Sequence, residues 1–529
     1  MTIYKTPIPF ARMAAFVAVV LLMSSAACSD DGAGENEADP DAGPVDDTGD
    51  EQVLEAKLGY TFETYHLPAG EEHVPCVQWT LNNEKPLYVN SVTMGNDGGF
   101  HHSNWYVVPE HHLDGDDGYF TCSDRGWSEQ TAALMGTVLF AQSTQSLIET
   151  QQFPEGVVTK IPPNHMIVAD LHFLNTTPED METQMRLELG LLHPKKVETI
   201  AAPFRLDYRD LDIPAQSQSR FRSQCDIAGE GAQFLPVGED GTLEDVELYY
   251  VLPHYHDLGN YFDLRIYGGP NDGENLFELE GFNAEANGQT FNPPIDLTGA
   301  KGLEFSCGFN NPRDEDVGWG IGDQEMCMML GYTNAGGIFD ASVGDGDNEV
   351  LGPDEDGIVK NTGPCDIFSA PASEGQSMPG QDELDGDLYV PDSGTDDDFQ
   401  PAPDCFDIPD DAQPLLAEPT LTDIEEYIFE PSCSFSACHG AGGGAAGLSL
   451  VGDDLHDHLL NHQTVTPTQM ELVEPGDASQ SWLYEVMAHC EPQSDVGPVN
   501  HMPLNSPALL PPDHVAMVRE WIDGGAQGD

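Results

Sequence analysis

The segment VELYYVLPHYHDL, at residues 246–258, decides the fold class of this chain. It is rich in β-branched and aromatic residues, and turn residues separate it from two similar runs, MIVADLHFLN (166–175) and YFDLRIYGG (261–269). Short runs of this composition between Gly, Pro, Asn and Asp are typical of β-strands. Their length and spacing predict a mainly β protein with two antiparallel β-sandwiches in series, divided near residues 196–205.

The charge of the chain restricts its partners. Its 529 residues include 18 Lys and Arg and 93 Asp and Glu, which give a formal net charge of −75. A surface this acidic repels phosphate, so nucleic acid is excluded as a partner. The length suggests two to four domains, and the 54 Gly and 40 Pro favour turn-rich β structure and linkers.

The first 28 residues are typical of an export signal. Two basic residues precede an apolar run at residues 13–23, which is too short to span a bilayer. The small residues before Cys28 resemble a bacterial lipobox, although Ser25 stands where Leu is usual. We therefore expect a signal peptide at residues 1–27 and a lipidated Cys28, so that a lipid anchor holds the exported chain facing the periplasm or the cell surface. The alternative is a secreted protein cut at the same bond.

Composition divides the rest of the chain into five parts. Two stretches are too rich in Asp, Glu, Gly and Pro to bury a core, and we expect a solvated tether and an acidic interdomain linker there. After the linker, LTDIEEYIFEPSC (421–433) and PDHVAMVREWIDGGA (512–526) have apolar residues at helical spacing, which predicts a small α-helical domain. The expected parts are the tether 28–56, the first sandwich 57–198, the second sandwich 199–370, the linker 371–415 and the helical domain 416–529.

Histidines in the strand-rich half form three arrangements, which are the pair His101-His102, the single His172, and His254 and His256 with one residue between them. Side chains alternate along a strand, so His254 and His256 share one face and can reach one metal ion. Adjacent histidines point apart in a regular strand. The pair His101-His102 therefore needs a bulge, a turn or ligation through Nδ1 atoms.

A thioether completes this ligand set. Met326 lies in the tripeptide Glu-Met-Cys, and imidazoles with one thioether suit copper that alternates between Cu(I) and Cu(II). The His pair, the single His about seventy residues later, the His-x-His followed by Gly, and this tripeptide resemble in order and spacing the copper type II, ascorbate-dependent monooxygenases. That family includes peptidylglycine α-hydroxylating monooxygenase and dopamine β-hydroxylase. The resemblance covers roughly residues 57–345.

The resemblance implies two jelly-roll-like sandwiches that face a solvent-filled cleft, with one copper ion in each. By position, one electron-storing copper would be held by His101, His102 and His172. The copper that binds O₂ and abstracts hydrogen would be held by His254, His256 and Met326. Such an enzyme hydroxylates a small-molecule substrate with O₂ and two electrons from an ascorbate-like or protein donor.

The resemblance also implies disulfides, which an exported chain can form in an oxidising compartment. The family has one beside its methionine ligand, where Cys307 and Cys327 lie here. The start of its second domain matches Cys225, which we pair with Cys365. Two further family-like positions lack their usual partners, and we expect them to pair with each other as Cys76–Cys122.

Positions that face the substrate in the peptide-amidating enzyme differ in this chain. Leu252, Leu330 and Met328 stand where that enzyme has Arg, Tyr and Asn. We therefore expect an apolar pocket and a substrate other than a glycine-extended peptide.

The helical domain contains Cys433-Ser-Phe-Ser-Ala-Cys438-His439, which resembles a c-type haem attachment with a lengthened spacer. The two thiols would bond to haem and His439 would coordinate iron, while Met502 resembles the sixth ligand of small bacterial cytochromes c. Two alternatives are a Cys433–Cys490 disulfide, with Cys438 as a single attachment or no haem, and a disulfide-stapled domain without cofactor. The histidines without a role, which we expect at the surface, are His456, His458, His462, His489 and His514.

These patterns favour a copper-dependent monooxygenase of unknown substrate that receives electrons through its own c-type haem. Two other classes stay open. One is a non-catalytic copper-binding or electron-transfer lipoprotein, which keeps the metal without turnover. The other is a surface adhesion module of two sandwiches, which predicts no stoichiometric metal. No Ser-His-Asp elbow, phosphate-binding Gly loop or Rossmann fingerprint stands in a supporting sequence context.

Overall fold

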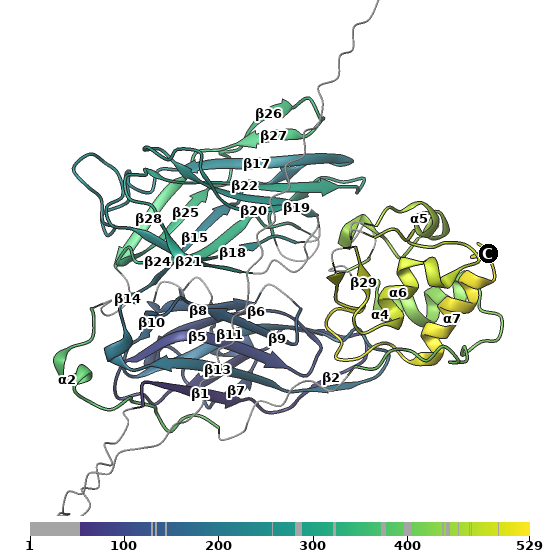
Figure 1. The fold of residues 1–529 in the computed structure, drawn as a ribbon, viewed down its shortest axis with the longest axis horizontal. Helices are drawn as coiled ribbons and strands as arrows, with labels where there is room; N and C mark the ends of the chain where they lie inside the picture. Colours follow the sequence, from purple (N-terminus) through teal and green to yellow (C-terminus); the bar gives the residue numbers. More distant parts are fainter. Residues whose placement is uncertain are drawn as a thin grey trace, which may run out of the picture. The chain divides into compact units, whose positions relative to one another are not determined.

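Strands make up most of the chain between Glu55 and Pro371, and short helices make up its C-terminal part (Figure 1). The mainly β prediction is therefore confirmed. The predicted signal peptide, Cys28 and the tether up to residue 52 lie outside the described residues. The computed structural model describes residues 53–528 except 129–130, 133–134, 143–144, 257, 281–287, 321–323, 372–376, 396–404, 436–437, 441–444, 453, 465, 467 and 496.

The first sandwich consists of two sheets around one core. One sheet has the spatial order β1 (Glu55–Thr61), β13 (Met185–Leu192), β5 (Leu87–Asn96), β10 (Val157–Ile161) and β14 (Thr199–Ile200), with β9 (Ile148–Gln152) also beside β5. The other has the order β7 (Gly118–Phe120), β4 (Cys76–Thr80), β11 (His165–Leu174), β6 (Phe100–Pro109) and β8 (Thr137–Gln142), with β3 (Glu72–His73) beside β11. The smaller elements are β2 (Tyr65–Leu67), paired with β12 (Met181–Thr183), and the 3₁₀ turns η1 (Glu110–His112), η2 (Cys122–Arg125) and η3 (Pro194–Lys196).

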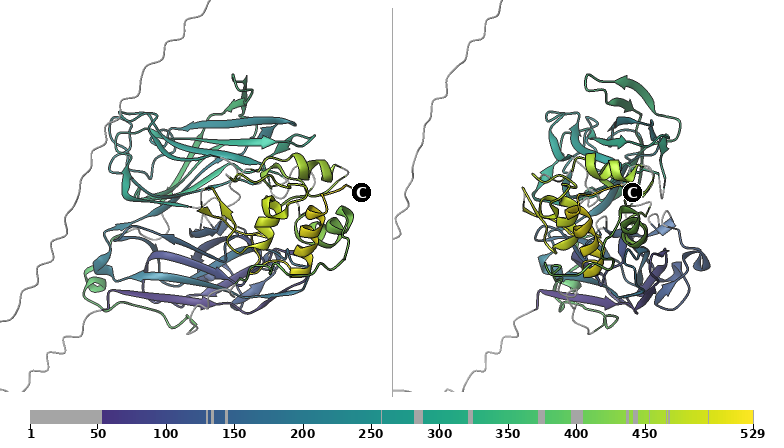
Figure 2. Two further views of the ribbon diagram at one scale, coloured as in Figure 1. Left: turned by 45° about the vertical axis from the view of Figure 1, so that its right-hand side comes forward. Right: turned by 90° about the vertical axis from the view of Figure 1, so that its right-hand side faces the viewer.

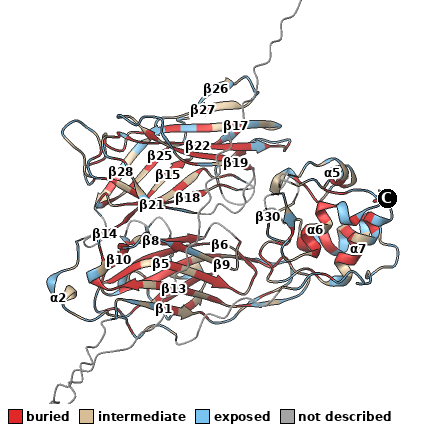
Figure 3. Ribbon diagram, viewed as in Figure 1, coloured by how far each residue is buried: buried red, intermediate tan, exposed pale blue. Residues whose placement is uncertain are grey.

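Hydrophobic alternation explains how these sheets face one another. In β13 the residues Leu187, Leu189 and Leu191 are buried, while Glu188 and Gly190 between them are partly exposed, as the period of a strand requires. They share one core with Trp79 and Ile167 of the opposite sheet. Figure 3 shows the buried residues along β5 and β13.

The second sandwich repeats this plan. One sheet has the order β21 (Gln289–Asp296), β18 (Glu247–His254), β24 (Met328–Thr333), β15 (Ala202–Tyr208), β25 (Gly337–Val343) and β28 (Asp366–Pro371). The other has the order β20 (Asn275–Glu280), β19 (Gly259–Tyr267), β22 (Gly302–Asn311), β17 (Ser217–Cys225), β27 (Val359–Thr362) and β26 (Glu349–Pro353). A short ribbon joins β16 (Asp212–Ile213) to β23 (Val317–Gly318).

Three strand pairs correct the prediction of purely antiparallel sheets. β10–β14, β15–β25 and β17–β27 are parallel, whereas the other pairs between named strands are antiparallel. The partners in each parallel pair are far apart in sequence, so a long connection can return the chain in the same direction. At β14 the chain pairs once more with the first sandwich before it enters β15 of the second.

An apolar cluster joins the two sandwiches. Leu252 is 2% exposed and packs with Phe153 of the first sandwich, and Leu330 packs against the same cluster. The Tyr332 hydroxyl lies 3.1 Å from the carbonyl oxygens of both Val138 and Leu139 and donates to them. The two leucines that the resemblance placed at a substrate pocket therefore lie between the domains instead.

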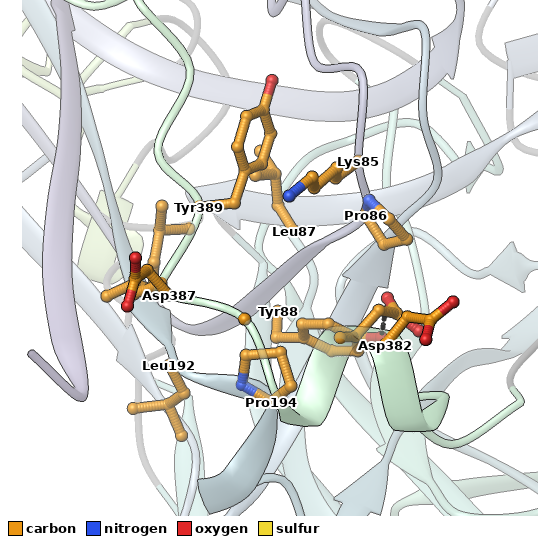
Figure 4. Close-up of a pocket in the computed structure, with 13 residues that line it drawn as sticks. Lys85, Pro86, Leu87, Tyr88, Leu192, Pro194, Asp382, Asp387 and Tyr389 are labelled. Carbon is orange, nitrogen blue, oxygen red and sulfur yellow. Dashed lines mark hydrogen bonds between the residues drawn. The ribbon is translucent and has the colours of Figure 1, made fainter. Parts of the chain in front are cut away.

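The segment predicted as an acidic linker lies along the first sandwich. The Trp79 indole donates to the Ser393 carbonyl at 3.0 Å, and the Tyr88 hydroxyl donates to Glu383 in α2 (Gln381–Leu384) at 2.8 Å. The ammonium of Lys85 lies 5.6 Å from the Tyr389 ring centroid, beside the small pocket in Figure 4. Aromatic and hydrogen-bonding groups thus attach a segment whose composition predicted a solvated chain.

The C-terminal domain contains the two predicted helical stretches. Its elements are α3 (Leu421–Ile424), the π-helical η4 (Glu425–Phe429), α4 (Glu430–Ser432), η5 (Ala445–Gly447), α5 (Leu455–Asn461), η6 (Ala478–Gln480), α6 (Trp482–Ala488), the β29 (Gln493–Ser494) and β30 (Gly497–Pro498) ribbon, and α7 (Pro512–Asp523). Ile424 and Phe429 share one core with Val515 and Ile522, as their spacing predicted, and Figure 2 shows these helices gathered together. Within the described ranges, no helix has the length and apolar character needed to cross a membrane.

The disulfides confirm the three predicted pairs, Cys76–Cys122, Cys225–Cys365 and Cys307–Cys327. A fourth disulfide in the described chain joins Cys405 to Cys490. The alternative pairing of Cys433 with Cys490 is therefore wrong. Cys433 and Cys438 take part in no disulfide.

Candidate functional site

A β-bulge resolves the conflict between two adjacent histidines. β6 and β11 pair so that His102 lies opposite His172, but Phe100 lies opposite Phe173. The register therefore skips His101, which is the extra residue of the bulge. The ring centroids of His101 and His102 are 5.2 Å apart. A bulge was one of the solutions that the sequence required for this pair.

The single histidine of β11 joins that pair. The His172 ring centroid lies 4.8 Å from that of His101 and 4.7 Å from that of His102. Its Nδ1 is hydrogen-bonded to His102 Nε2 at 2.9 Å, and its Nε2 to the Glu72 carboxylate at 2.5 Å. The buried Nδ1 of His101 has no hydrogen-bond partner. Such an orphaned group costs about 1–3 kcal/mol, so a ligand at this nitrogen would stabilise the site.

The His-x-His segment lies at the end of β18. The ring centroids of His254 and His256 are 5.3 Å apart, which fits the prediction that they share a side. Tyr255 between them is only 5% exposed and packs in the core of the second sandwich. A Cβ on Gly259 would lie 2.0 Å from the Tyr255 ring, so this packing requires glycine there. The Gly that follows His-x-His thus has a structural reason.

The carboxylate of Glu325, which is 1% exposed, fixes the turn beside Met326. It accepts N–H groups from His256 at 2.8 Å, Leu258 at 2.7 Å and Met326 at 3.3 Å. Burial raises the pKa of Glu325 to about 7, while the three N–H donors and Arg313 act in the opposite direction. One buried carboxylate therefore holds the backbones of His256 and Met326 together.

Two further contacts position the Met326 segment. The disulfide Cys307–Cys327 ties the residue after Met326 to β22, and Met328 lies opposite His254 in the pairing of β24 with β18. His256 Nδ1 lies 2.7 Å from the Gln324 carbonyl, to which it donates, so the lone pair of that ring is on Nε2. Met326 is half-buried between these fixed points.

The two groups of histidines meet. The His102 ring centroid lies 6.4 Å from that of His254, only slightly more than the 4.7–5.3 Å separations within each group. The resemblance implied two clusters across a wide cleft, whereas the structure forms one continuous group. We call this group the histidine array, and its members are His101, His102, His172, His254 and His256.

The environment of the histidine array favours the neutral form of four of its five imidazoles, those of His101, His102, His172 and His254. Burial, with smaller contributions from neighbouring imidazoles, lowers the pKa of His101 and of His254 to about 3 and that of His102 well below its ordinary value. Burial also lowers the pKa of His172, although Glu72 opposes this effect. Neutral imidazoles are the form that binds metal.

The fit to copper rests on these donors rather than on a preformed coordination sphere. As the side chains stand in the described residues, no group of three or more His, Cys, Asp or Glu is posed to hold a metal ion. Both ring nitrogens of His172 are hydrogen-bonded, one to His102 and the other to Glu72, so His172 can bind a metal ion only if one of these two bonds breaks. Neutral imidazoles, the orphaned Nδ1 of His101, and the thioether of Met326, whose backbone shares the Glu325 carboxylate with that of His256, nevertheless form a donor set that suits copper.

A second candidate site lies in the C-terminal domain, where a cavity of about 210 Å³ is lined by Cys433, Cys438, His439 and Met502. Its walls are mostly apolar and include Phe429, Leu450, Trp482, Leu483 and Val486. The structure therefore brings together the four residues that the sequence assigned to haem.

One backbone hydrogen bond spans the lengthened spacer between the two thiols. His439 N–H donates to the Cys433 carbonyl at 3.0 Å, which closes the loop. His439 Nδ1 donates to the Leu448 carbonyl at 3.1 Å, so Nε2 carries the lone pair that a metal ion needs. Burial lowers the pKa of His439 and raises the pKa of Cys433 to about 12, which keeps the imidazole neutral and the thiol protonated. Two thiols, an imidazole and a thioether around an apolar space fit a c-type haem.

Three residues at these sites were missed in the sequence. Glu72 contacts His172, Glu325 holds the Met326 turn, and Asn505 lines the C-terminal cavity. The Glu-Met-Cys tripeptide carried a signal for Glu325, but nothing local marked the other two. His462 was expected at the surface and instead lines the cavity, because tertiary packing places a residue with polar neighbours there.

Comparisons with known proteins do not identify a family. No family model and no curated protein matches the chain. Among solved structures, the chain is similar to the cowpea mosaic virus top component, with 8% identity and a TM-score of 0.25 over 54% of this chain and 89% of that chain. It is also similar to a triple jelly roll protein from the turret assembly of an archaeal virus, with 8% identity and a TM-score of 0.15 over 54% of this chain and 59% of that chain. Likenesses this weak say nothing about function.

Proposed function

We propose that this chain is a copper-dependent monooxygenase, related to the copper type II, ascorbate-dependent enzymes, that hydroxylates a small or apolar substrate with O₂. The observation that supports this function is the histidine array. Five imidazoles from β6, β11 and the end of β18 meet with ring centroids 4.7–6.4 Å apart. Buried imidazoles this close together would repel one another if they were protonated, which favours the neutral form of the rings. Neutral imidazoles can bind a metal ion, so a role as metal ligands explains the array better than packing alone.

The residues of the array have separate roles in this proposal. The trio His101, His102 and His172 would hold one copper ion, and His254, His256 and Met326 would hold the second. Copper would supply one-electron redox chemistry and the activation of O₂ there. Burial lowers the pKa of His101, His102, His172 and His254, which favours their neutral form, and Glu325 keeps the Met326 segment against His256. A thioether is a weak ligand, which suits a site that must admit O₂.

The C-terminal domain would hold a c-type haem. Cys433 and Cys438 would form the covalent attachment, and His439 and Met502 would be the axial ligands. The haem would supply an electron store whose potential a methionine ligand raises. Lipidation at Cys28 would keep the exported chain at a membrane surface, where a donor could reduce it.

Cofactor stoichiometry tests the proposal. The full chain, exported by a host that matures c-type cytochromes, should contain two copper ions and one covalent haem. The double variant His102→Ala/His172→Ala should lose one copper ion. The matched control His111→Ala/His112→Ala changes a second His-His pair, in η1, and should keep both ions. A wild-type chain without stoichiometric copper would reject the proposal and favour the adhesion module.

A non-catalytic electron-transfer protein is the second candidate. The observation that favours it is the position of Leu252 and Leu330, which pack in the apolar cluster between the sandwiches and line only a small cavity of about 10 Å³ there. Oxygen consumption with excess ascorbate and a panel of small apolar substrates separates the two functions. In a monooxygenase, Met326→Ile should abolish oxygen consumption while the copper held by the trio remains. Two bound copper ions with no oxygen consumption by the wild-type chain would favour electron transfer.

A further inference from the structure

The two candidate sites are joined by a short segment of the C-terminal domain. Met502 lines the C-terminal cavity, and the residues after it, 503–507, contact the ends of β6 and β11. These strands carry His101, His102 and His172. The segment therefore contacts both the proposed haem cavity and the proposed copper trio.

Asn505 makes most of these contacts and is only 1% exposed. Its carbonyl accepts the Gly99 N–H at 2.8 Å. Its side-chain Nδ2 donates to the Leu174 carbonyl at 2.7 Å, and its Oδ1 accepts the Thr176 hydroxyl at 2.7 Å. Asn505 thus bonds residues two positions from His101 and two positions from His172. No other type of side chain of this size offers one donor and one acceptor in the same plane.

Close packing supports the same contact. A Cβ on Gly98 would lie 2.4 Å from Cδ of Pro507 and 3.3 Å from the Asn505 carbonyl oxygen. The first sandwich also supplies Thr176 and Gln145 to the wall of the C-terminal cavity. The cavity is therefore completed by the domain that carries the copper trio, which a solitary cytochrome domain would not need.

We propose that Asn505 is the positioning residue that couples the C-terminal cavity to the histidine array, because it fixes the segment after Met502 to both strands of the copper trio. This inference rests on the proposed function. It identifies the electron acceptor of the C-terminal domain as the first sandwich of the same chain, rather than a separate copper protein.

The contact supplies two short through-bond routes from the C-terminal cavity to the copper trio, each made of covalent bonds and one hydrogen bond. One runs from Met502 through three peptide units to Asn505, crosses the 2.8 Å hydrogen bond to Gly99 and reaches His101 two residues later. The other crosses the 2.7 Å bond from the Asn505 side chain to Leu174 and reaches His172 two residues earlier. With both cofactors bound, these routes would carry a single electron from ferrous haem to one cupric ion, with no bond formed or broken, and the external donor would restore the ferrous state.

Amide hydrogen exchange on the full apo chain tests the contact without any cofactor. Asn505→Ala should speed exchange of the Gly99 amide about tenfold or more, as expected when one or two buried hydrogen bonds are lost. The Leu81 amide, which bonds to the His165 carbonyl at the opposite end of β11, is the internal reference. Thr176→Val, which removes one hydroxyl and keeps the side-chain shape, should give a smaller effect in the same direction and serves if Asn505→Ala fails to fold.

Asn311→Ala is the matched control. Asn311 is fully buried, and its side-chain amide donates to the carbonyls of Ile213, Pro214 and Glu315 inside the second sandwich. It should lower global stability without a selective effect on Gly99. Unchanged Gly99 exchange in both Asn505→Ala and Thr176→Val would overturn the inference, whether or not the chain binds copper or haem.

The loaded chain gives the second readout. Asn505→Ala should slow the oxidation of reduced haem by the copper sites severalfold, measured by rapid-mixing absorbance. Direct reduction of copper by excess ascorbate should stay at the wild-type rate. Equal rates of haem oxidation in the variant and the wild type would contradict the coupling role. If the purified chain contains neither copper nor haem, the proposed function is rejected. The hydrogen-exchange test alone then decides whether Asn505 makes the contact.

Discussion

At the residue scale, the account depends on imidazoles that stay neutral. The pKa of His101 and of His254 is lowered to about 3 in the folded chain, from the ordinary 6.5 that holds in the unfolded chain. Between these values the unfolded chain binds protons that the folded apo chain does not. The stability is therefore complete above pH 6.5 and decreases as the pH falls toward 3.

This linkage gives the first prediction. The free energy of unfolding of the apo chain should fall below pH 6.5 with a slope of up to about 1.4 kcal/mol per pH unit for each such imidazole. His101→Gln should make the slope shallower, because one lowered pKa is removed. Urea denaturation over this pH range measures the effect. Parallel slopes for the variant and the wild type would show that His101 is protonated as easily as in the unfolded chain.

Glu325 gives the second prediction. Glu325→Ala leaves the N–H groups of His256, Leu258 and Met326 without their acceptor, and we expect a loss of about 2–4 kcal/mol in the free energy of unfolding. Glu182→Ala removes a 64%-exposed carboxylate that pairs with His66, and should cost less than about 1 kcal/mol. Chemical denaturation of both variants provides the comparison. Equal losses would contradict the role of Glu325 as a buried anchor.

At the scale of elements, the strands that carry the site were predictable and their contacts were not. The run at residues 166–175 is β11 and the run at 261–269 corresponds to β19, because alternation and turn residues are local signals. The bulge at His101 was one of three solutions that the sequence left open for two adjacent histidines, and the strand register decides among them. Leu252 gave no such signal, because an apolar residue has the same pattern whether it faces a substrate or another sandwich.

That interface gives the third prediction. Leu252→Ala should lower the free energy of unfolding by about 2–5 kcal/mol and loosen the contact between the sandwiches, because it opens a space in the apolar cluster. Leu351→Ala, at a residue that is 61% exposed in β26, should change it by less than about 0.5 kcal/mol. Calorimetry measures both. A small effect at Leu252 would mean that the two sandwiches are not held together there.

At the scale of the whole molecule, charge and long-range contacts dominate. The acidic segment predicted as a linker attaches to the first sandwich through Tyr88 and Trp79, and Asn505 attaches the C-terminal domain to the strands of the copper trio. Both contacts join residues about 300 positions apart, which no local pattern reports. Three of the four disulfides in the described residues were predictable because the resemblance ordered their cysteines. Cys405–Cys490 lies outside the resemblance, and spacing alone leaves many pairings.

The net charge of −75 gives the fourth prediction. Repulsion among carboxylates opposes the compact state, so the melting temperature of the full chain should rise as NaCl increases from low concentration to about 0.15 M, where the Debye length falls to about 8 Å. An equal osmolality of sucrose is the control for effects of solute alone. A melting temperature that falls over this salt range would show that attractive ion pairs outweigh the repulsion.

X-ray absorption at the copper edge is the measurement that tests the central claim most directly. The full chain is loaded with Cu(I) in a Cys433→Ser/Cys438→Ser background, which removes the two thiols that lie outside disulfides in the described residues. The account predicts imidazole scattering around copper and one sulfur shell, and Met326→Ile should remove the sulfur shell while imidazole scattering remains. Copper without imidazole scattering, or a sulfur shell that survives Met326→Ile, would contradict a site built from the histidine array and this thioether.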